Sequence, residues 1–260
     1  MTQIELITKL LHSKQLLIGM VAPSFPVMYM YPHIIGKIRR LGFDKVVEVT
    51  VGAAKTNSDL IKAFTDNPKA RYITSPCPSV VRLIQKKYPE LSTYVMIKTD
   101  SPMIATSKLM KEKYSHHIPV FIGPCFAKKT EAKDDPSALG IVVITYVELE
   151  ALFQTFSIHD DISDSHAVFD MEELSTRSYP TDGALTQTSN IRSILKDEEI
   201  RIVSGWKNCD VALHEFATNS SIRLLDILFC DGGCISGPGI ASPLSVEERR
   251  QRIMAFHTRG

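Results

Sequence analysis

The sequence predicts an α/β protein with two lobes of mainly parallel sheet flanked by helices. Short runs rich in Val and Ile alternate with segments at helical spacing, a pattern that favours parallel sheets covered by helices. A polar, acidic and poorly periodic stretch at residues 157–187 separates two such regions, and long connections of this kind are often functional or mobile. We therefore expect one domain over residues 1–260, with lobes of about 1–156 and 188–260 joined by this polar connection.

Each expected strand is a short apolar run, whereas apolar residues at helical spacing mark the segments between the strands. The strands are expected at residues 16–22, 45–50, 71–75, 119–123, 140–145, 201–204 and 223–230. A short amphipathic helix is expected at 1–13, and further helices at 28–41, 59–66, 78–88, 102–114, 146–156, 188–196, 208–216 and 245–257.

The composition is that of a soluble globular protein. Hydrophobic residues make up 44% of the chain and charged residues 23%, with a formal net charge of +1. No nucleic-acid partner is expected, because phosphate binders usually carry a basic excess. The apolar runs are far shorter than the roughly 20 residues of a membrane span, and the first 13 residues lack the apolar core of a signal peptide. We therefore expect no membrane association and a cytoplasmic location.

Four of the five cysteines are placed as the ligands of one site. Cys77, Cys125 and Cys230 each follow an expected strand, and Cys234 lies four residues after Cys230 across two glycines. In open α/β sheets the loops after the strands converge on the ligand crevice, so these thiols should meet. Four thiolates form a soft site, suited to zinc or an iron–sulfur cluster. Cys209 lies in a helical segment without such flanks and is expected to be a buried core residue.

Three segments around these cysteines resemble the catalytic domain of FeFe hydrogenases, in the same order along the chain. They are residues 74–78 (TSPCP), 123–131 (GPCFAKKTE) and 230–239 (CDGGCISGPG). Weaker similarity extends over most of the 260 residues. The resemblance implies a cofactor held between the two lobes, the H-cluster. It consists of a 4Fe-4S cluster linked through one cysteine sulfur to a 2Fe subcluster with CO, cyanide and dithiolate ligands.

The resemblance also implies roles for individual residues. Cys77, Cys125 and Cys230 would be terminal ligands of the 4Fe-4S cluster, and Cys234 would bridge to the 2Fe unit. Lys128 and Ser24 match residues that contact the cyanide ligands of the 2Fe unit, and we count both with Cys234 as candidate catalytic residues. The alternative for Lys128 is an ordinary solvated surface charge. Pro124, directly before Cys125, stiffens its loop and is expected to border the cofactor.

The sequence departs from the family at several positions near the expected 2Fe unit. Efficient members have a proton-donating cysteine directly before the first ligand, and this position is Pro76 here. Proline has no titratable group and no backbone N–H, so it cannot relay a proton. Gly123 and Leu228 stand where the family has methionines, and Met103 stands where it often has a polar residue. Asp59 is the nearest candidate for a carboxylate of the family's proton path.

These observations predict an FeFe-hydrogenase-like oxidoreductase of anaerobic metabolism that interconverts protons, electrons and H2, slowly or as a sensor. The resemblance implies that electrons come from a ferredoxin or another redox module, and that hydrogenase maturation proteins insert the cofactor. Two alternatives remain. One is an iron–sulfur binding or assembly protein that holds cubane clusters alone, without hydrogenase activity. The other is a structural zinc site with four cysteine ligands.

Overall fold

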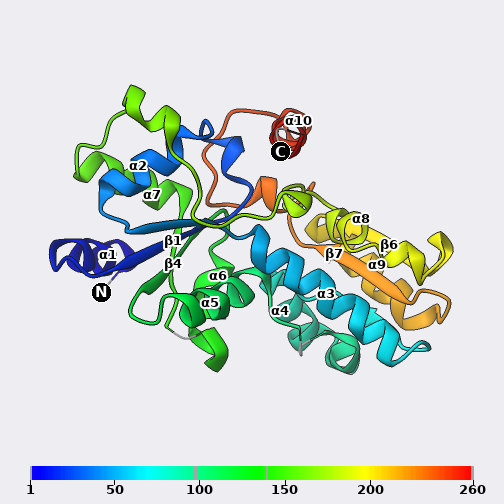
Figure 1. Cartoon of the computed structure of the whole chain (residues 1–260). Helices are drawn as coiled ribbons and strands as arrows, with labels where there is room; N and C mark the ends of the chain where they lie inside the picture. Colours follow the sequence, from blue (N-terminus) through cyan, green and yellow to red (C-terminus); the bar gives the residue numbers. More distant parts are fainter. Residues whose placement is uncertain (1, 97–98, 139, 259–260) are drawn as a thin grey trace.

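The computed structural model describes residues 2–96, 99–138 and 140–258, and these form two lobes that lie side by side (Figure 1). Each lobe has its own parallel sheet. The expected α/β class is therefore confirmed. Met1, where the N-terminal helix was expected to begin, lies outside the described residues, as do the last two residues of the expected domain.

The first lobe is built on a sheet with the strand order β2-β1-β4-β5, in which all neighbours are parallel. Every residue of β1 is buried, which is typical of parallel strands with helices on both faces. The strands are β1 (Leu17–Val21), β2 (Lys45–Glu48), β4 (Ile118–Gly123) and β5 (Val142–Thr145). The helices that pack on them are α1 (Gln3–His12), α2 (His33–Leu41), α5 (Pro102–Lys113), α6 (Ala127–Asp134) and α7 (Tyr146–Thr155).

The second lobe has the strand order β3-β7-β6, again with parallel neighbours. Its strands are β3 (Tyr72–Ile73), β6 (Ile200–Ser204) and β7 (Leu224–Leu228), and its helices are α3 (Thr50–Asp66), α4 (Pro78–Lys87), α8 (Ala184–Thr188) and α9 (Trp206–Thr218). This sheet takes β3 from within the range expected for the first lobe. The two sheets therefore do not divide the chain at a single point.

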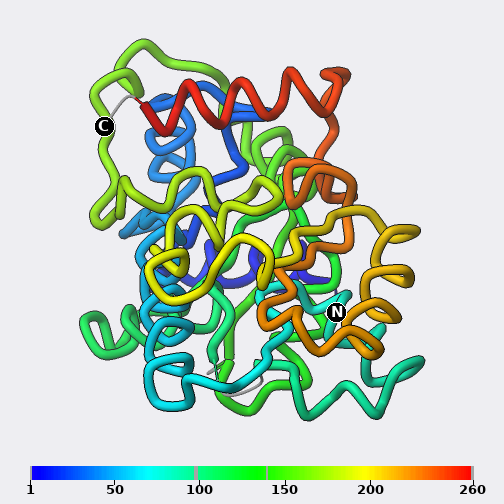
Figure 2. Tube along the Cα trace, turned by 90° about the vertical axis from the view of Figure 1, so that its right-hand side faces the viewer, coloured from blue at the N-terminus to red at the C-terminus, as the bar shows by residue number. Residues whose placement is uncertain are grey.

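Three elements connect the lobes. Helix α3 packs against α5 of the first lobe, and the connection after α7 crosses from one lobe to the other (Figure 1). Helix α10 (Val246–His257) runs along one edge of the molecule, as the red segment of Figure 2 shows. It packs Ile253 against Val27 and Ile235, which lie in the loops after β1 and β7.

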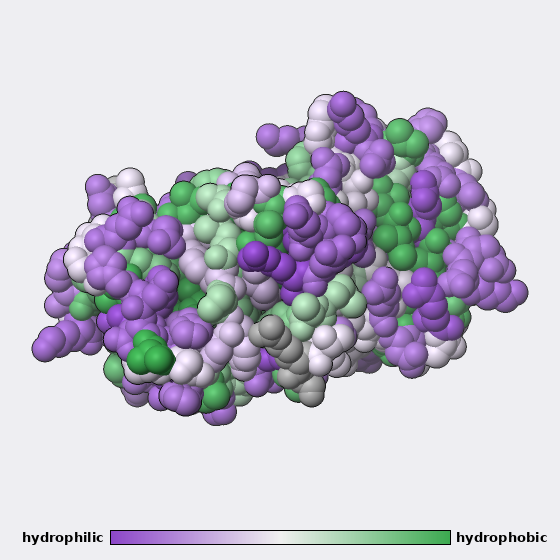
Figure 3. Space-filling view, turned by 90° about the horizontal axis from the view of Figure 1, so that it is seen from above, coloured by the Kyte–Doolittle hydropathy of each residue, from purple (hydrophilic) through white to green (hydrophobic). Residues whose placement is uncertain are grey.

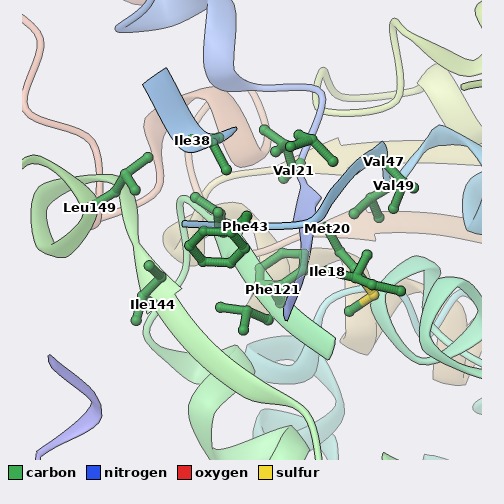
Figure 4. Close-up of a cluster of buried hydrophobic side chains, with 14 of the residues drawn as sticks. Ile18, Met20, Val21, Ile38, Phe43, Val47, Val49, Phe121, Ile144 and Leu149 are labelled. Atoms are coloured by element: carbon green, nitrogen blue, oxygen red, sulfur yellow. The ribbon is translucent and has the colours of Figure 1, made fainter. Parts of the chain in front are cut away.

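The largest hydrophobic core lies around the first sheet. Met20 of β1, Val47 of β2, Phe121 of β4 and Ile144 of β5 are at most 4% exposed, and Figure 4 shows them gathered within one cluster. A second core, which includes Leu225 of β7, lies around the other sheet. The cores hold both sheets in place, so the loops after their strands have fixed positions.

The surface seen from above in Figure 3 is mostly hydrophilic, with hydrophobic side chains in smaller patches. Within the described part of the chain, none of the helices combines the length and the apolar character needed to cross a membrane.

All seven expected strands are present, but some expected helices are wrong. Helix α3 begins at Thr50 instead of 59. A Cβ on Gly52 would lie 2.1 Å from the Pro102 carbonyl oxygen, so glycine is required here for α3 to approach α5, although it weakens a helix signal. The expected helix at 188–196 is only a 3-10 turn at Ile191–Ser193, because Asn190 adopts a positive φ of 58°.

Two further helices differ from the prediction. Helix α6 was not expected, because five of its eight residues are charged and it has little apolar periodicity. Helix α2 begins at His33 instead of 28, directly after Pro32. The residue before a proline disfavours the helical region, so the helix cannot extend back through this position.

The polar connection is held in place by buried ion pairs. Arg177 is 2% exposed and its Nε donates to Oε2 of Glu48 at 3.1 Å, with Glu48 fully buried at the end of β2. Its guanidinium also bonds Glu172 and lies 4.1 Å from the centre of the Phe256 ring. Arg40 of α2 binds Asp164 in the same connection. The connection is thus fixed to β2, α2 and α10.

Candidate metal centre

The four predicted cysteines lie in loops that follow the strands of both sheets. Cys77 precedes α4 in the loop after β3, and Cys125 follows β4. Cys230 and Cys234 lie in the loop after β7. Because all these strands are parallel within their sheets, their carboxyl ends bring the loops toward a common place, the usual position of a ligand site in such folds.

The thiols are close enough to influence one another's ionisation. Burial raises the pKa of Cys77, and the charge of Cys125 raises it further. Burial raises the pKa of Cys230 to about 12, with contributions from Cys77 and Cys125. Burial likewise raises the pKa of Cys234 strongly, and the charges of Cys77, Cys125 and Cys230 add to it. Every pair within the set is therefore coupled, which indicates that the four thiols share one neighbourhood; Cys209 of the second core is coupled to Cys77 and Cys230 as well.

Four thiols can hold either a single metal ion or an iron–sulfur cluster. Among the residues that the structure describes, no three Cys, His, Asp or Glu side chains lie close enough to hold one metal ion. A zinc ion needs all its ligands within about 2.3 Å, whereas a 4Fe-4S cluster binds each thiolate through a different iron atom. Raised thiol pKa values are compatible with either metal, because binding releases the thiol protons.

Glycine shapes the loop that carries Cys230 and Cys234. Gly232 and Gly233 have positive φ values of 72° and 97°, where a Cβ is disfavoured. A Cβ on Gly233 would also lie 2.6 Å from the Pro180 carbonyl oxygen. The two glycines thus turn the chain sharply between the two cysteines, as the sequence predicted.

A cavity of about 80 Å³ borders Cys125 and Cys234. Its wall is mostly apolar, and the volume exceeds the 10–15 Å³ that a single water requires. The lining residues come from both lobes: Ala22, Pro23, Ser24, Val49, Pro76, Pro102, Met103, Phe121, Pro124, Cys125, Lys128, Tyr179, Pro180, Thr181, Leu185, Asp226, Leu228 and Cys234. Three candidates besides the cysteines, Ser24, Pro124 and Lys128, thus face the same space.

Lys128 is a buried cation and not a solvated surface charge. Its residue is 8% exposed, and its Nζ lies 2.6 Å from Oε2 of Glu131. The ammonium also donates to the carbonyl oxygen of Pro76 at 3.1 Å. A lysine has three N–H donors, so one remains for an anionic ligand in the cavity. The surface-charge alternative for Lys128 is therefore wrong.

Ser24 is fully buried and already has a hydrogen-bond partner. The Tyr146 hydroxyl donates its single proton to the Ala22 carbonyl oxygen at 2.7 Å. Ser24 Oγ lies 2.8 Å from the same hydroxyl oxygen, so it donates to Tyr146. To donate to a ligand in the cavity, Ser24 must turn its proton away from Tyr146. Tyr146 can then donate to Ser24 instead.

Of the other positions named in the sequence analysis, some line the cavity and others do not. Pro76, Met103 and Leu228 line the cavity. Gly123 is not among the lining residues, because the Phe121 ring fills the space where a Cβ of Gly123 would lie. Asp59 is also absent from the lining; it lies inside α3, paired with Lys55. Cys209 is fully buried in the second core, as expected.

Sequence reasoning missed three polar residues of the cavity, Tyr179, Thr181 and Asp226. Tyr179 lies in the stretch that was read as a connection. Asp226 lies in a strand that the sequence analysis did predict. It is the one carboxylate in the otherwise apolar sequence of β7, LLDIL, and this could have marked it as a functional residue. Buried carboxylates are rare without partners.

Comparison with known proteins identifies the family. The model for the iron-only hydrogenase large subunit, C-terminal domain, matches residues 16–238. The chain belongs to this family. Iron hydrogenase 1 of Clostridium pasteurianum is 25% identical to this hydrogenase-family chain, over 79% of the chain and 45% of the relative. The chain thus spans less than half the length of that relative.

Solved hydrogenase structures share the fold of this iron-only hydrogenase domain. An apo FeFe-hydrogenase variant from Chlamydomonas reinhardtii aligns with a TM-score of 0.73 at 17% identity, over 99% of this chain and 88% of that one. A hydrogenase whose structure describes stepwise H-cluster assembly aligns with a TM-score of 0.72 at 18% identity, with the same coverage. The resemblance that the cysteine segments indicated is confirmed.

Proposed function

We propose that this chain binds an H-cluster and interconverts protons, electrons and H2, either slowly or as a hydrogen sensor. One observation carries the proposal: four mutually coupled thiols lie near one another, and two of them, Cys125 and Cys234, line a largely apolar cavity that Lys128 and Ser24 also line. The domain, about 1–260, would hold the cofactor between its two lobes. Membership in the family agrees with this reading.

The residues present fit the cofactor. Cys77, Cys125, Cys230 and Cys234 would hold the 4Fe-4S cluster, with Cys234 bridging to a 2Fe unit in the cavity. Lys128 has a free donor for an anionic ligand, and charge-assisted hydrogen bonds are strongest where water is excluded. When bound, the group supplies iron sites at which protons and electrons combine. The protein holds it, excludes water and delivers protons.

Pro76 is the main reason to expect slow turnover. It lines the cavity at the position where efficient relatives donate a proton, and it offers only a carbonyl oxygen, which Lys128 already occupies. Pro76→Cys should therefore raise the rate of hydrogen evolution. A rate in the unchanged protein equal to that of a cysteine-bearing relative would contradict the slow or sensory part of the proposal.

The decisive measurement is an infrared spectrum after anaerobic maturation, together with iron and sulfide counts. Metal-bound CO and cyanide bands are expected. Cys234→Ser should abolish these bands, and Cys230→Ser should lower the iron content. The matched control is Cys209→Ser, which changes a thiol outside the site and should leave both readouts intact. Iron-loaded protein without CO or cyanide bands would refute the H-cluster.

That result would support a second candidate, a cubane-only iron–sulfur binding or assembly protein. One observation favours it: the hydroxyl proton of Ser24 is engaged with Tyr146, and the Lys128 ammonium is already neutralised by Glu131. Such a protein would need the four cysteines but not the two cavity residues. Lys128→Met would then leave iron content and cluster stability unchanged.

The partners follow from the same proposal. Electrons would arrive from a ferredoxin or another redox module, and hydrogenase maturation proteins would supply the 2Fe unit. Reduction of the matured protein by a ferredoxin, followed as loss of visible absorbance, tests the first of these.

A further inference from the structure

Two polar side chains on the cavity wall have no role in holding the cofactor. Asp226 of β7 is 2% exposed, and Tyr179 of the connection has a hydroxyl that is buried without a hydrogen-bond partner among the described residues. Both line the cavity, as Cys234 does. A buried hydroxyl without a partner is unfavourable, so its presence next to a ligand cavity calls for an explanation.

Asp226 is held toward its neutral, proton-carrying form. Its Oδ2 accepts from the backbone N–H of Thr186 at 3.1 Å and from the Thr186 hydroxyl at 2.7 Å. These donors are uncharged and only partly offset burial, which raises the pKa of Asp226 above its usual range. Leu225 and Ile227 point into the second core, whereas Asp226 and Leu228 line the cavity, as alternation along a strand requires.

Tyr179 lies near both Asp226 and Cys234. Burial raises its pKa most, and the charges of Asp226 and Cys234 raise it further, which places all three groups in one neighbourhood. A tyrosine hydroxyl can accept one proton while donating its own. Tyr179 can therefore pass a proton onward without ionising.

A second carboxyl near Asp226 has access to solvent. Asp182 is 25% exposed and near enough for its charge to act on Asp226. It accepts from Ser204 at 2.9 Å and from Arg250 at 2.6 Å. Carboxyl groups thus extend from the surface at Asp182 to the buried cavity wall at Asp226.

We propose that Asp226 and Tyr179 deliver protons to the group bound in the cavity, in place of the relay that Pro76 cannot provide. In the direction of hydrogen formation, the O–H bond of the Asp226 carboxyl breaks and its proton passes through one bridging water to the Tyr179 oxygen, because the Tyr179 hydroxyl has no hydrogen-bond partner among the described residues and proton transfer needs hydrogen-bond reach or a single water. The original Tyr179 proton passes to a basic atom of the bound group. The Asp226 carboxylate then takes up a proton from the Asp182 side. Only protons move in this transfer, and hydrogen oxidation reverses it.

This inference rests on the proposed function, and its test uses the matured protein. Tyr179→Phe removes one hydroxyl, and Asp226→Asn removes the exchangeable acid. Both should keep the CO and cyanide bands at full intensity while hydrogen evolution falls by about 10²-fold, the lower end of what acid–base groups contribute. Asp226→Glu should recover part of the rate. In protein carrying the 4Fe-4S cluster alone, the infrared band of a neutral carboxyl should vanish in Asp226→Asn and shift in Tyr179→Phe.

The chain offers a matched control pair. The Tyr88 hydroxyl donates to Oδ1 of Asp210 at 2.9 Å, outside the cavity. Tyr88→Phe and Asp210→Asn make the same chemical changes there and should alter neither the rate nor the carboxyl band.

The outcomes separate the two proposals. Unchanged protein without CO and cyanide bands overturns the proposed function, and the relay with it. Bands of full intensity, with turnover in Tyr179→Phe equal to that of the unchanged protein, overturn the relay alone. A carboxyl band at the same frequency in Tyr179→Phe as in the unchanged protein also overturns the relay alone. If Asp226→Asn does not fold, the hydrogen-evolution rate and the carboxyl band of Tyr179→Phe, which removes only one hydroxyl, decide whether the relay exists.

Discussion

Arg177→Met should destabilise the fold more at pH 8 than at pH 6. Arg177 is the buried cation that joins the polar connection to Glu48 at the end of β2. Methionine fills similar volume but leaves the carboxylate without its ion pair. Removing one partner of a buried pair lowers the free energy of unfolding by about 3–5 kcal/mol, which sets the expected loss at pH 8.

The dependence on pH follows from Glu48. Burial raises its pKa from 4.5 to about 7, and Arg177 works against this rise. The folded protein thus binds a proton more tightly than the unfolded chain, and this group's contribution becomes unfavourable between pH 4.5 and 7. At 1.36 kcal/mol for each pH unit, the full effect is about 3.4 kcal/mol. Without Arg177 the pKa of Glu48 rises further. The loss of unfolding free energy caused by Glu48 then continues to grow above pH 7, which makes the variant less stable at pH 8 than at pH 6.

The assay is urea unfolding of both proteins at pH 6 and pH 8, followed by circular dichroism. The control is Arg192→Met, which breaks the exposed pair of Arg192 with Asp197. Exposed pairs contribute at most about 1 kcal/mol, so this loss should be small at both pH values. An Arg177→Met loss below 1 kcal/mol at pH 8, or one that is larger at pH 6, would refute the reasoning.

Two further substitutions test the packing and the site. Gly52→Ala should lower the free energy of unfolding by about 1–3 kcal/mol, because its Cβ would meet the Pro102 carbonyl; thermal unfolding measures this, and a neutral effect would contradict the close approach of α3 to α5. Tyr146→Phe should free the Ser24 hydroxyl and remove one of two donors to the Ala22 carbonyl, which keeps the Phe25 N–H at 3.1 Å; the expected loss of stability is about 0.5–1.5 kcal/mol. In matured protein it should also shift a cyanide band, and an unmoved spectrum would exclude Ser24 as a cyanide partner.

The sequence predicted the helices and strands that can be recognised from the pattern of neighbouring residues alone. All seven strands were found because each is an apolar run, and four cysteines were grouped because they follow strand ends. Helix α6 was missed because its residues are mostly charged, and the start of α3 was misplaced because Gly52 serves a contact with α5. That contact joins residues about 50 positions apart, which a local pattern cannot reveal.

The sequence predicted those site residues whose side chains have a distinctive chemistry. Cysteine and lysine stand out in sequence, whereas the engagement of Ser24 by Tyr146 depends on a contact between residues 122 positions apart. Tyr179 was hidden in an irregular stretch without periodicity. Only the three-dimensional arrangement shows that it lines the same cavity as Asp226 and Cys234.

The parallel pairing of β3 with β7 bears on the order of events during synthesis. Tyr72 pairs with Leu224, so the segment before Cys77 lacks its neighbouring strand until some 150 further residues have been made. At about 5–20 residues per second, that delay is about 8–30 s. The first sheet can form earlier, since β5 ends at Thr145. A nascent chain would therefore present Cys125 on a folded first sheet before Cys77 reaches its final position, and any group that binds both cysteines would be loaded only after β7 has been made.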